Sequence, residues 1–270
     1  MTIAYDGTAY SGWQKQQNPA VQTVEGVVEE GLRRLFRKDD LTIIGASRTD
    51  AGVHAMGQRA IVDVDTTIPL EKIPLAVRPF LPEDVVITAA RAVAPQFHPR
   101  FDCVKKTYAY RIWNDTVKNP KERLYAEFCC QPLDVEKMEQ AAQALCGTHD
   151  FQTFCAAGNQ TKTTVRTIFS CHVVREGNAV TIFVTGDGFL YHMVRILAGT
   201  LMQVGMGRIQ PEDMAGIIAS CDRKKAGPTA GAAGLTLQEI FYRKEDLDGM
   251  ESAENQEKIE KVLDFSKKTS

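Results

Sequence analysis

The 270-residue sequence lacks any apolar run that approaches the length of a membrane span. Its N-terminus, MTIAYDGT, also lacks the basic region followed by an apolar stretch that marks a signal peptide. General disorder is not expected either, because 44% of the residues are hydrophobic and 24% are charged, as in ordinary globular proteins. We therefore expect a cytoplasmic protein that has no membrane partner.

The sequence also lacks the common motifs for cofactors and metals. It has no Gly-x-Gly-x-x-Gly, no phosphate loop that ends in Gly-Lys-Ser/Thr and no Gly-x-Ser-x-Gly. Its seven cysteines form no Cys-x-x-Cys pair, and the combinations Cys146/His149 and Cys171/His172 lack zinc-like spacing. We expect reduced thiols, no metal and no cofactor, so any catalysis must come from side chains.

The chain has no excess of positive charge overall, but its basic residues are concentrated in a few short clusters. The net charge of −2 argues weakly against a nucleic-acid partner. Residues 244–270 hold five Lys and eight acidic residues, however, whereas residues 1–243 hold 27 basic and 26 acidic ones. Contacts with phosphate require local Lys and Arg, not a basic average. Basic clusters occur at RRLFRK (33–38), KK (105–106), KNPKER (118–123) and RKK (223–225). Such clusters are commonly solvated surface, yet four of them make an RNA or DNA partner plausible.

The periodicity of apolar residues predicts a mixture of strands and helices. Strands are expected at 2–7, 41–47, 58–66, 84–93, 106–113, 123–130, 166–174, 179–187 and 235–242, and helices at 23–38, 133–147, 189–204 and 211–221. The order lacks the strict strand–helix alternation of a doubly wound sheet, which favours an α+β fold with a mixed, largely antiparallel sheet. We expect an N-terminal α+β subdomain over 1–95, a C-terminal α+β subdomain over 96–243, and a charged, loosely ordered tail over 244–270.

Asp50 is the leading candidate for a catalytic acid. It lies in GASRTDAGVHAMGQ (45–58), after an apolar strand, with Arg48 before it and His54 after it. Asp-x-Gly is also an ordinary turn sequence, because Asp bonds its own backbone and Gly accepts a positive φ. From this stretch alone the turn is the more common explanation.

Arg195 is a second candidate because it lies in an apolar sequence, GDGFLYHMVRILAGTL (186–201), that predicts a buried helix. A buried guanidinium requires a partner. A local carbonyl, Asp187 two turns away and Asp50 from another segment are all possible partners. The sequence leaves the three open.

Tyr108 is a third candidate, in the strand KKTYAYRIW (105–113), where alternation places it on the same face as Tyr110. Aromatic side chains beside Lys and Arg can stack on a nucleic-acid base. Tyr in a strand more often serves packing alone, so both interpretations stand.

Five segments, in order, closely resemble the TruA family, the tRNA pseudouridine synthases A. The family's pattern around its catalytic Asp is Gly or Ser, then Arg-Thr-Asp-Ala/Ser-Gly-Val-His-Ala. The matching segments are YDGTAYSGWQ (5–14), GASRTDAGVHAMGQ (45–58), FHPRFDCVKKTYAYRI (97–112), GTHDFQTFCA (147–156) and GFLYHMVRILAGTL (188–201). Together they cover most of residues 1–243.

The resemblance implies a function and roles for individual residues. The family isomerises uridine to pseudouridine at positions 38 to 40 of tRNA, as a homodimer without cofactor or metal, with two similar α+β halves around a central active-site cleft. Catalytic positions implied by it are Asp50, its partner Arg195 and the base-stacking Tyr108, and substrate-binding positions are Arg48, Tyr108, His54 and Leu190. The basic residues Lys105, Lys106, Arg223, Lys224 and Lys225 are expected at the RNA backbone.

The chain departs from the family pattern at a few positions, which leaves alternatives open. The family often has Asn where this chain has Asp187, and commonly Pro where Gly231 stands. One alternative is a pseudouridine synthase with other RNA targets, and another is a relative that binds structured RNA without modifying it. An acid–base enzyme for small molecules explains less, because it gives the basic clusters and Tyr108 no role.

Overall fold

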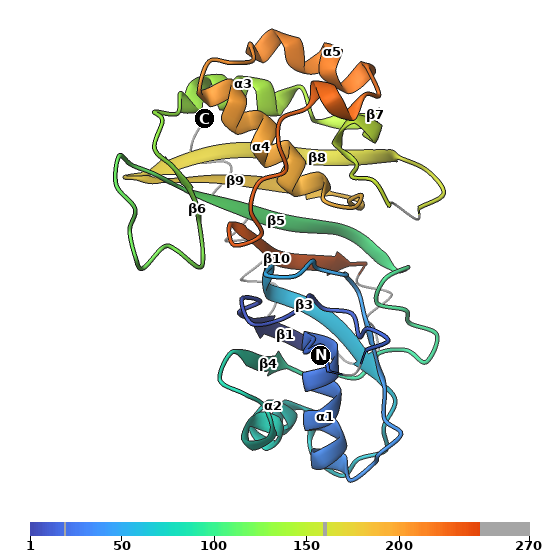
Figure 1. Ribbon diagram of the computed structural model, residues 1–270. Helices are drawn as coiled ribbons and strands as arrows, with labels where there is room; N and C mark the ends of the chain where they lie inside the picture. The colour runs from blue at the N-terminus through green and yellow to red at the C-terminus, as the bar shows by residue number, and fades with distance from the viewer. Residues whose placement is uncertain (19, 159–160, 244–270) are drawn as a thin grey trace.

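The computed structural model describes residues 1–18, 20–158 and 161–243 (Figure 1). The expected tail over 244–270 lies outside the described residues. The strands are β1 Thr2–Tyr5, β2 Ile43–Gly45, β3 His54–Val62, β4 Val85–Ala89, β5 Cys103–Asn114, β6 Glu127–Cys129, β7 Gly147–Asp150, β8 Val165–Glu176, β9 Ala179–Gly186 and β10 Leu235–Tyr242. The α-helices are α1 Val24–Phe36, α2 Ile73–Val77, α3 Val135–Gln143, α4 Met193–Gly205 and α5 Met214–Ala219. Short 3₁₀ helices are η1 Leu70–Lys72, η2 Arg78–Phe80, η3 Gln152–Phe154, η4 Pro211–Asp213 and η5 Arg223–Lys225.

One mixed sheet runs through the described part of the chain. The strand order is β4-β1-β3-β10-β5-β9-β8-β7, with β2 also paired to β3 and β6 to β5. Only the β10–β3 and β5–β6 pairs are parallel, and the other pairs are antiparallel. The predicted α+β class with a mixed, largely antiparallel sheet is therefore confirmed. β10, from the end of the described chain, lies between β3 of the first half and β5 of the second.

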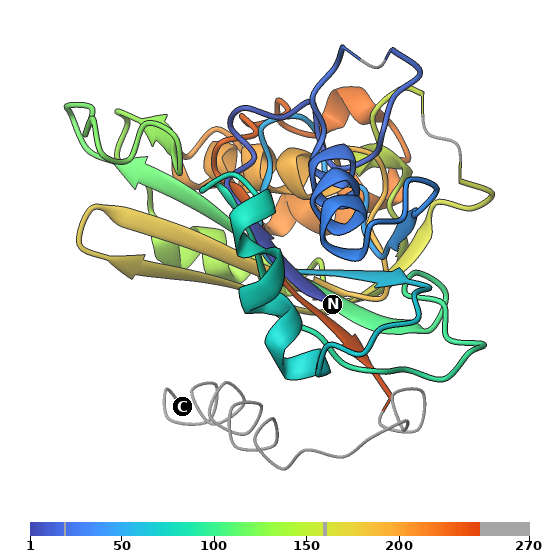
Figure 2. The same ribbon diagram turned by 90° about the horizontal axis from the view of Figure 1, so that it is seen from below.

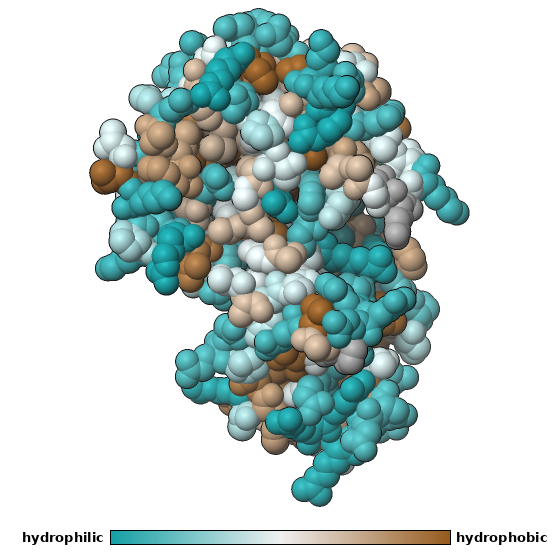
Figure 3. All heavy atoms as spheres, in the orientation of Figure 1, coloured by the Kyte–Doolittle hydropathy of each residue, from teal (hydrophilic) through white to brown (hydrophobic). Residues whose placement is uncertain are grey.

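The helices divide between the two ends of the sheet. Figure 1 shows α1 and α2 at the end that carries β1 and β4, and α3, α4 and α5 gathered above β8 and β9. The view from below shows the strands fanning out across the sheet, as the right-handed twist of strands requires (Figure 2). The molecule is broad at the α3–α5 end and narrower at the α1–α2 end, with a mostly hydrophilic surface on the face in view (Figure 3).

Two of the predicted helices form where the periodicity of apolar residues indicated, and each begins at a side chain that caps it. In α1 the buried residues Val24, Val28 and Leu32 recur every four positions, and the Thr23 side chain accepts a hydrogen bond from the Gly26 backbone N at 3.3 Å. In α3 the Asp134 side chain accepts from the Lys137 backbone N at 3.1 Å. Both helix predictions are confirmed, although α3 ends at Gln143, before its expected end.

Other elements differ from the prediction. The helix expected from residue 189 begins only at Met193, so Arg195 lies in its first turn and not at its centre. The helix expected over 211–221 begins as 3₁₀, with Pro211 first, and is α-helical only over Met214–Ala219. α2 and β7 were not predicted, because five and four residues are too few to show a period.

The core is continuous from one end of the sheet to the other. No helix in the described ranges is long and apolar enough to cross a membrane. All seven cysteines are free thiols, and the neighbours Cys129 and Cys130 are buried and exposed respectively, as their opposite directions from a strand predict.

Candidate active site

Asp50 lies in a turn between β2 and β3, and its side chain points out of that turn. The Val53 backbone N donates to the Asp50 carbonyl O at 3.2 Å, and Gly52 has a φ of 76°. The common turn interpretation is therefore correct for the backbone. The carboxylate is nevertheless engaged elsewhere: its Oδ2 lies 3.6 Å from Arg195 Nη1 and 3.5 Å from His192 Nε2.

The segment that precedes α1 fixes the Asp50 turn in place. The Trp13 backbone N donates to the Thr49 carbonyl O at 3.1 Å, and the Gly52 backbone N donates to the Tyr10 carbonyl O at 3.2 Å. Gly12 has a φ of 88°, and a Cβ added there would lie 2.6 Å from the Thr49 carbonyl O. The sequence segments 5–14 and 45–58 thus form one structural unit around the carboxylate.

Arg195 contacts both a carbonyl and the carboxylate. Its Nε donates to the Ala230 carbonyl O at 2.7 Å, while Nη1 faces Asp50. The Tyr110 hydroxyl donates to the neighbouring Gly231 carbonyl O at 2.9 Å, which helps to hold this segment. Asp187 instead accepts from the Thr167 backbone N at 3.0 Å, so it is not the partner of Arg195. Of the three partners that the sequence left open, the structure selects Asp50; the carbonyl that Arg195 contacts is not local, because Ala230 lies 35 residues further along the chain.

A cavity of about 360 Å³ opens beside Asp50, a volume suited to a small ligand or a single nucleotide base. Its described lining comprises Ala46, Ser47, Arg48, Thr49, Asp50, Val53, Arg100, Lys106, Tyr108, Gly158, Thr161, Phe189, Leu190, Tyr191, His192, Met193, Val194 and Leu235. These residues come from the β2–β3 connection, β5 and the segment before it, the connection between η3 and β8, the start of α4 with the residues before it, and the start of β10, so the cavity is assembled from both halves of the sheet.

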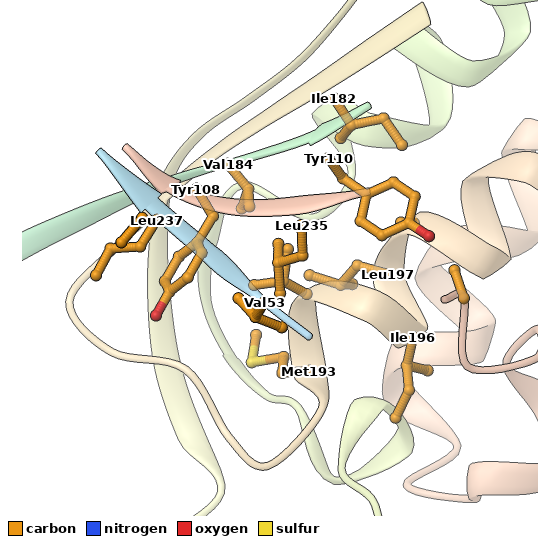
Figure 4. Packing of buried hydrophobic residues seen from close by; sticks show 14 of the residues in the cluster. Val53, Tyr108, Tyr110, Ile182, Val184, Met193, Ile196, Leu197, Leu235 and Leu237 are labelled. Atoms are coloured by element: carbon orange, nitrogen blue, oxygen red, sulfur yellow. The ribbon is translucent and has the colours of Figure 1, made fainter. Parts of the chain in front are cut away.

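Tyr108 contributes a buried aromatic wall to this cavity. Tyr108 and Tyr110 extend from the same side of β5, toward Met193 and Leu197 of α4 (Figure 4). The Tyr108 hydroxyl lies 2.9 Å from Ser47 Oγ, and its ring meets the edge of Phe189 with centroids 5.2 Å apart. Burial raises the pKa of Tyr108 to about 12, so the phenol is neutral at neutral pH.

The pKa values of His192 and Lys106 are both lowered, as expected for basic groups in a partly buried site. Burial lowers the pKa of His192, and Arg195 lowers it further, while the Asp50 carboxylate opposes both effects. His192 also adopts a left-handed backbone conformation with a φ of 58° directly before α4. Burial lowers the pKa of Lys106 as well, and its ammonium donates to the Ala46 carbonyl O at 2.9 Å. Strained backbone and perturbed pKa values of this kind are typical of functional sites.

The structure brings together some of the predicted site residues but not all. Asp50, Arg48, Lys106, Tyr108 and Leu190 line the cavity, and Arg195 contacts Asp50. The predicted residues outside the lining are His54, Lys105, Arg223, Lys224 and Lys225.

His54 and Arg223 have clear structural partners where they lie. The buried His54 ring accepts at Nδ1 from the Gly7 backbone N at 3.1 Å and donates from Nε2 to the Leu124 carbonyl O at 2.9 Å. Arg223 donates to the Gly227 carbonyl O at 2.9 Å and to Thr229 Oγ1 at 3.1 Å. Both side chains are therefore occupied by contacts within the protein.

Sequence reasoning did not single out four residues that shape the site: Gln14, Arg100, Phe189 and His192. Gln14, Arg100 and His192 lie in the segments 5–14, 97–112 and 188–201, so their position in these segments was the available signal. Phe189 directly precedes Leu190 in the last of them.

The arrangement can bind a flat ligand and act on it with a carboxylate. The Asp50 carboxylate, in contact with Arg195, can serve as a nucleophile or a base, and the Tyr108 ring offers a surface for stacking. In the described ranges no group of three or more His, Cys, Asp or Glu side chains is arranged to hold a metal ion.

Comparison with known proteins gives consistent matches. A family model described as tRNA pseudouridine synthase matches residues 1–102 and 141–243. The chain is 46% identical over 242 residues to tRNA pseudouridine synthase A 2 of Clostridium tetani, covering 90% of this chain and 97% of that protein. It is 41% identical to tRNA pseudouridine synthase A of Caldicellulosiruptor saccharolyticus and 44% identical to that of Moorella thermoacetica, each over 90% of this chain and 98% of the relative.

Proposed function

This chain belongs to the tRNA pseudouridine synthase family, and from that premise we propose that it isomerises uridine to pseudouridine at positions 38 to 40 of the tRNA anticodon stem-loop. The observation that carries the proposal is the Asp50 carboxylate, which lies 3.6 Å from Arg195 Nη1 at the wall of a cavity that also presents Tyr108. A protein that only binds RNA has no need for such a carboxylate–guanidinium pair.

The chemistry gives each of these residues a role. Uracil must detach from the ribose at N1, rotate and rejoin at C5, so the nucleotide must first leave the base stack. Tyr108 holds the displaced base by stacking, and Arg48 assists its displacement. Asp50, oriented by its contact with Arg195, acts on the nucleotide as nucleophile or base. Leu190 completes the apolar wall of the cavity.

The proposal extends to the partner, the assembly and the compartment. The bound RNA is tRNA, the active form is a homodimer, and the reaction takes place in the cytoplasm without a cofactor. Residues 1–95 form the subdomain that carries Asp50, and residues 96–243 form the second. Lys106 in the cavity and the exposed Lys224 and Lys225 are available for contacts with the RNA backbone.

The decisive experiment maps pseudouridine in unmodified tRNA transcripts after incubation with wild type and with Asp50→Asn. We expect new pseudouridine in the anticodon stem-loop with wild type only, and a rate at least about 100-fold lower for Asp50→Asn, since general-base and nucleophilic groups contribute at least that much. RNA binding should stay close to wild type, because the substitution leaves the basic side chains in place.

Asp187→Asn is the matched control. It makes the same chemical change, but its side chain accepts from the Thr167 backbone N and an amide oxygen can do the same. Pseudouridine at other positions would overturn the target and leave the reaction standing. Tight binding without any modification by wild type would favour an RNA-binding relative that has lost catalysis.

A further inference from the structure

The cavity beside Asp50 carries more positive charge than the protein neutralises. Its described lining contains three basic side chains, the guanidiniums of Arg48 and Arg100 and the amine of Lys106, whose pKa is lowered by burial. Asp50 is the one carboxylate in that same lining, and it already contacts Arg195. Arg48 and Arg100 therefore face the cavity without a carboxylate of their own in its lining, and the acidic side chain that acts on both, Glu25, lies outside that lining.

Of the three basic side chains, that of Arg100 has the fewest polar partners in the described part of the chain. Within the described chain its guanidinium takes part in no hydrogen bond and no ion pair, although the residue is only partly exposed. Burial lowers the pKa of Arg100 and the nearby Arg48 lowers it further, yet a guanidinium stays charged at neutral pH. Partly buried arginines elsewhere in this chain have partners, such as Arg111 with Glu122 at 3.0 Å. Glu25 acts electrostatically on both guanidiniums but forms no ion pair with either in the described chain, so the two neighbouring groups can accept an anion from outside.

The backbone that carries Arg100 is fixed, although its side chain has no partner. The His98 backbone N donates to Asp102 Oδ2 at 2.7 Å, and the Asp102 backbone N donates back to the His98 carbonyl O at 3.1 Å. The Arg100 backbone N donates to His98 Nδ1 at 3.2 Å, and the Tyr242 hydroxyl of β10 donates to the Pro99 carbonyl O at 2.7 Å. The turn thus fixes the backbone from which the Arg100 side chain extends to the cavity lining before any ligand arrives.

The side chain of Arg48 is oriented by an uncharged group, the amide of Gln14. Its Nε donates to Gln14 Oε1 at 3.1 Å, and the Gln14 amide nitrogen donates in turn to the buried Glu25 carboxylate. Glu25 also accepts from the Lys15 backbone N at 2.7 Å, which fixes the orientation of the carboxylate. Because an amide and not a carboxylate contacts Arg48, its direction is set while its positive charge stays available.

We propose that Arg100 and Arg48 together bind one phosphodiester group of the RNA strand, adjoining the uridine that stacks on Tyr108. The inference rests on the proposed function for the identity of that uridine. A nucleotide displaced into the cavity carries a phosphate on each side of its ribose, and the forked guanidinium matches phosphate oxygens in geometry and charge. Arg100 then positions the strand, while Asp50 and Arg195 act on the nucleotide.

The test combines neutral phosphates in the RNA with removal of the guanidinium. Anticodon stem-loop RNAs are made with a single methylphosphonate, which has no charge, at each phosphate around the target in turn. Dissociation constants and pseudouridine formation are measured for wild type, Arg100→Gln and Arg78→Gln. The exposed Arg78 lies outside the cavity lining, so its variant loses the same charge at a different place.

We expect one methylphosphonate position at which wild type and Arg78→Gln both lose affinity by about 10- to 100-fold, the effect of a lost charge-assisted hydrogen bond. At that position Arg100→Gln should lose clearly less affinity than wild type, because only the Arg48 contact with that phosphate is left to lose. With unmodified RNA, Arg100→Gln should reduce the slope of log affinity against log salt by about 0.7 to 0.9 relative to wild type. Arg100→Lys should keep the wild-type slope and regain part of the affinity.

If every methylphosphonate weakens Arg100→Gln as much as wild type, Arg100 does not bind a phosphate and the inference is wrong. The two proposals also fail separately. A wild-type protein that shows the selective effect on binding but forms no pseudouridine would contradict the proposed function alone. Normal pseudouridine formation without any selective position would contradict the phosphate site alone.

Discussion

At the scale of single residues, the backbone of the site residues forms turns and helix starts, while their side chains form the site. Asp50 closes an ordinary turn with Val53, yet its carboxylate is free to meet Arg195 and His192. His192 takes a left-handed conformation that costs a non-glycine residue free energy, about 1 kcal/mol or more. That conformation directs the chain into α4 while its ring stays beside Asp50. The same few residues thus serve the fold and the chemistry.

The His192 imidazole should make the stability of the protein depend on pH. Its pKa is lowered in the folded state from an unfolded value of 6.5 because the effect of burial, to which Arg195 adds, exceeds the opposing effect of the Asp50 carboxylate. The folded protein therefore binds this proton more weakly than the unfolded chain does, so the free energy of unfolding falls as the pH drops below 6.5. In His192→Asn this part of the decline should be missing. Asn tolerates the left-handed conformation, which keeps the backbone intact.

Melting temperatures from about pH 8 down to about pH 5 measure this effect, since that range spans the titration of histidine. His149→Gln serves as the control, because its ring lies outside the cavity lining and contacts the Cys146 carbonyl O. The control should show the same decline as wild type. A His192→Asn variant whose melting temperature falls with pH as steeply as that of wild type would contradict the prediction.

At the scale of elements, the sequence predicted what has a period and a cap, and missed what has neither. Thr23 and Asp134 mark the starts of α1 and α3 because their side chains accept backbone hydrogen bonds there. The start of α4 was placed too early, since an apolar sequence without a capping residue gives no signal and the left-handed His192 sets the start instead. The contact of Asp50 with Arg195 joins residues 145 positions apart, and only the folded sheet reveals it.

The 3₁₀ helix η5 should divide its three basic residues between two tasks. Arg223 holds the Gly227–Thr229 segment, next to the Ala230 carbonyl O that accepts from Arg195, whereas Lys224 and Lys225 are exposed. Arg223→Ala should therefore reduce the free energy of unfolding by about 1–3 kcal/mol, through two lost hydrogen bonds.

Lys224→Glu and Lys225→Glu should instead leave the melting temperature nearly unchanged and weaken RNA binding. Each lost phosphate contact should flatten the slope of log affinity against log salt by about 0.7 to 0.9. Thermal unfolding and binding titrations at several salt concentrations separate the two effects. An unaltered salt slope in both lysine variants would place η5 away from the RNA.

At the scale of the whole molecule, β10 joins the two halves that share the site. It pairs with β3 of the first half and with β5 of the second, and Leu237 at its centre lies beside Ala55 and Tyr108. Arg48 and Asp50 come from one side of this junction, and Tyr108 and Arg195 from the other. Sequence periodicity identified β10 as a strand, but not its position, because it follows the other strands in the chain and still lies in the middle of the sheet.

The central position of β10 predicts that both halves unfold together. Leu237 is fully buried, so Leu237→Ala should reduce the free energy of unfolding by about 2–5 kcal/mol. The two tryptophans report on the halves separately, since Trp13 lies before α1 and Trp113 lies on β5. With Trp113→Phe or Trp13→Phe as the background, fluorescence follows one half at a time.

Leu237→Ala should lower the midpoint seen by each tryptophan by the same amount, and pseudouridine formation should disappear over the same temperature range. Leu75→Ala makes the same substitution at an exposed position on α2 and should shift neither midpoint. A midpoint that moves for one tryptophan and not for the other would mean that the halves unfold independently. In that case the contact between Asp50 and Arg195 would be lost when the less stable half unfolds, and activity would disappear over the temperature range of that half's fluorescence signal.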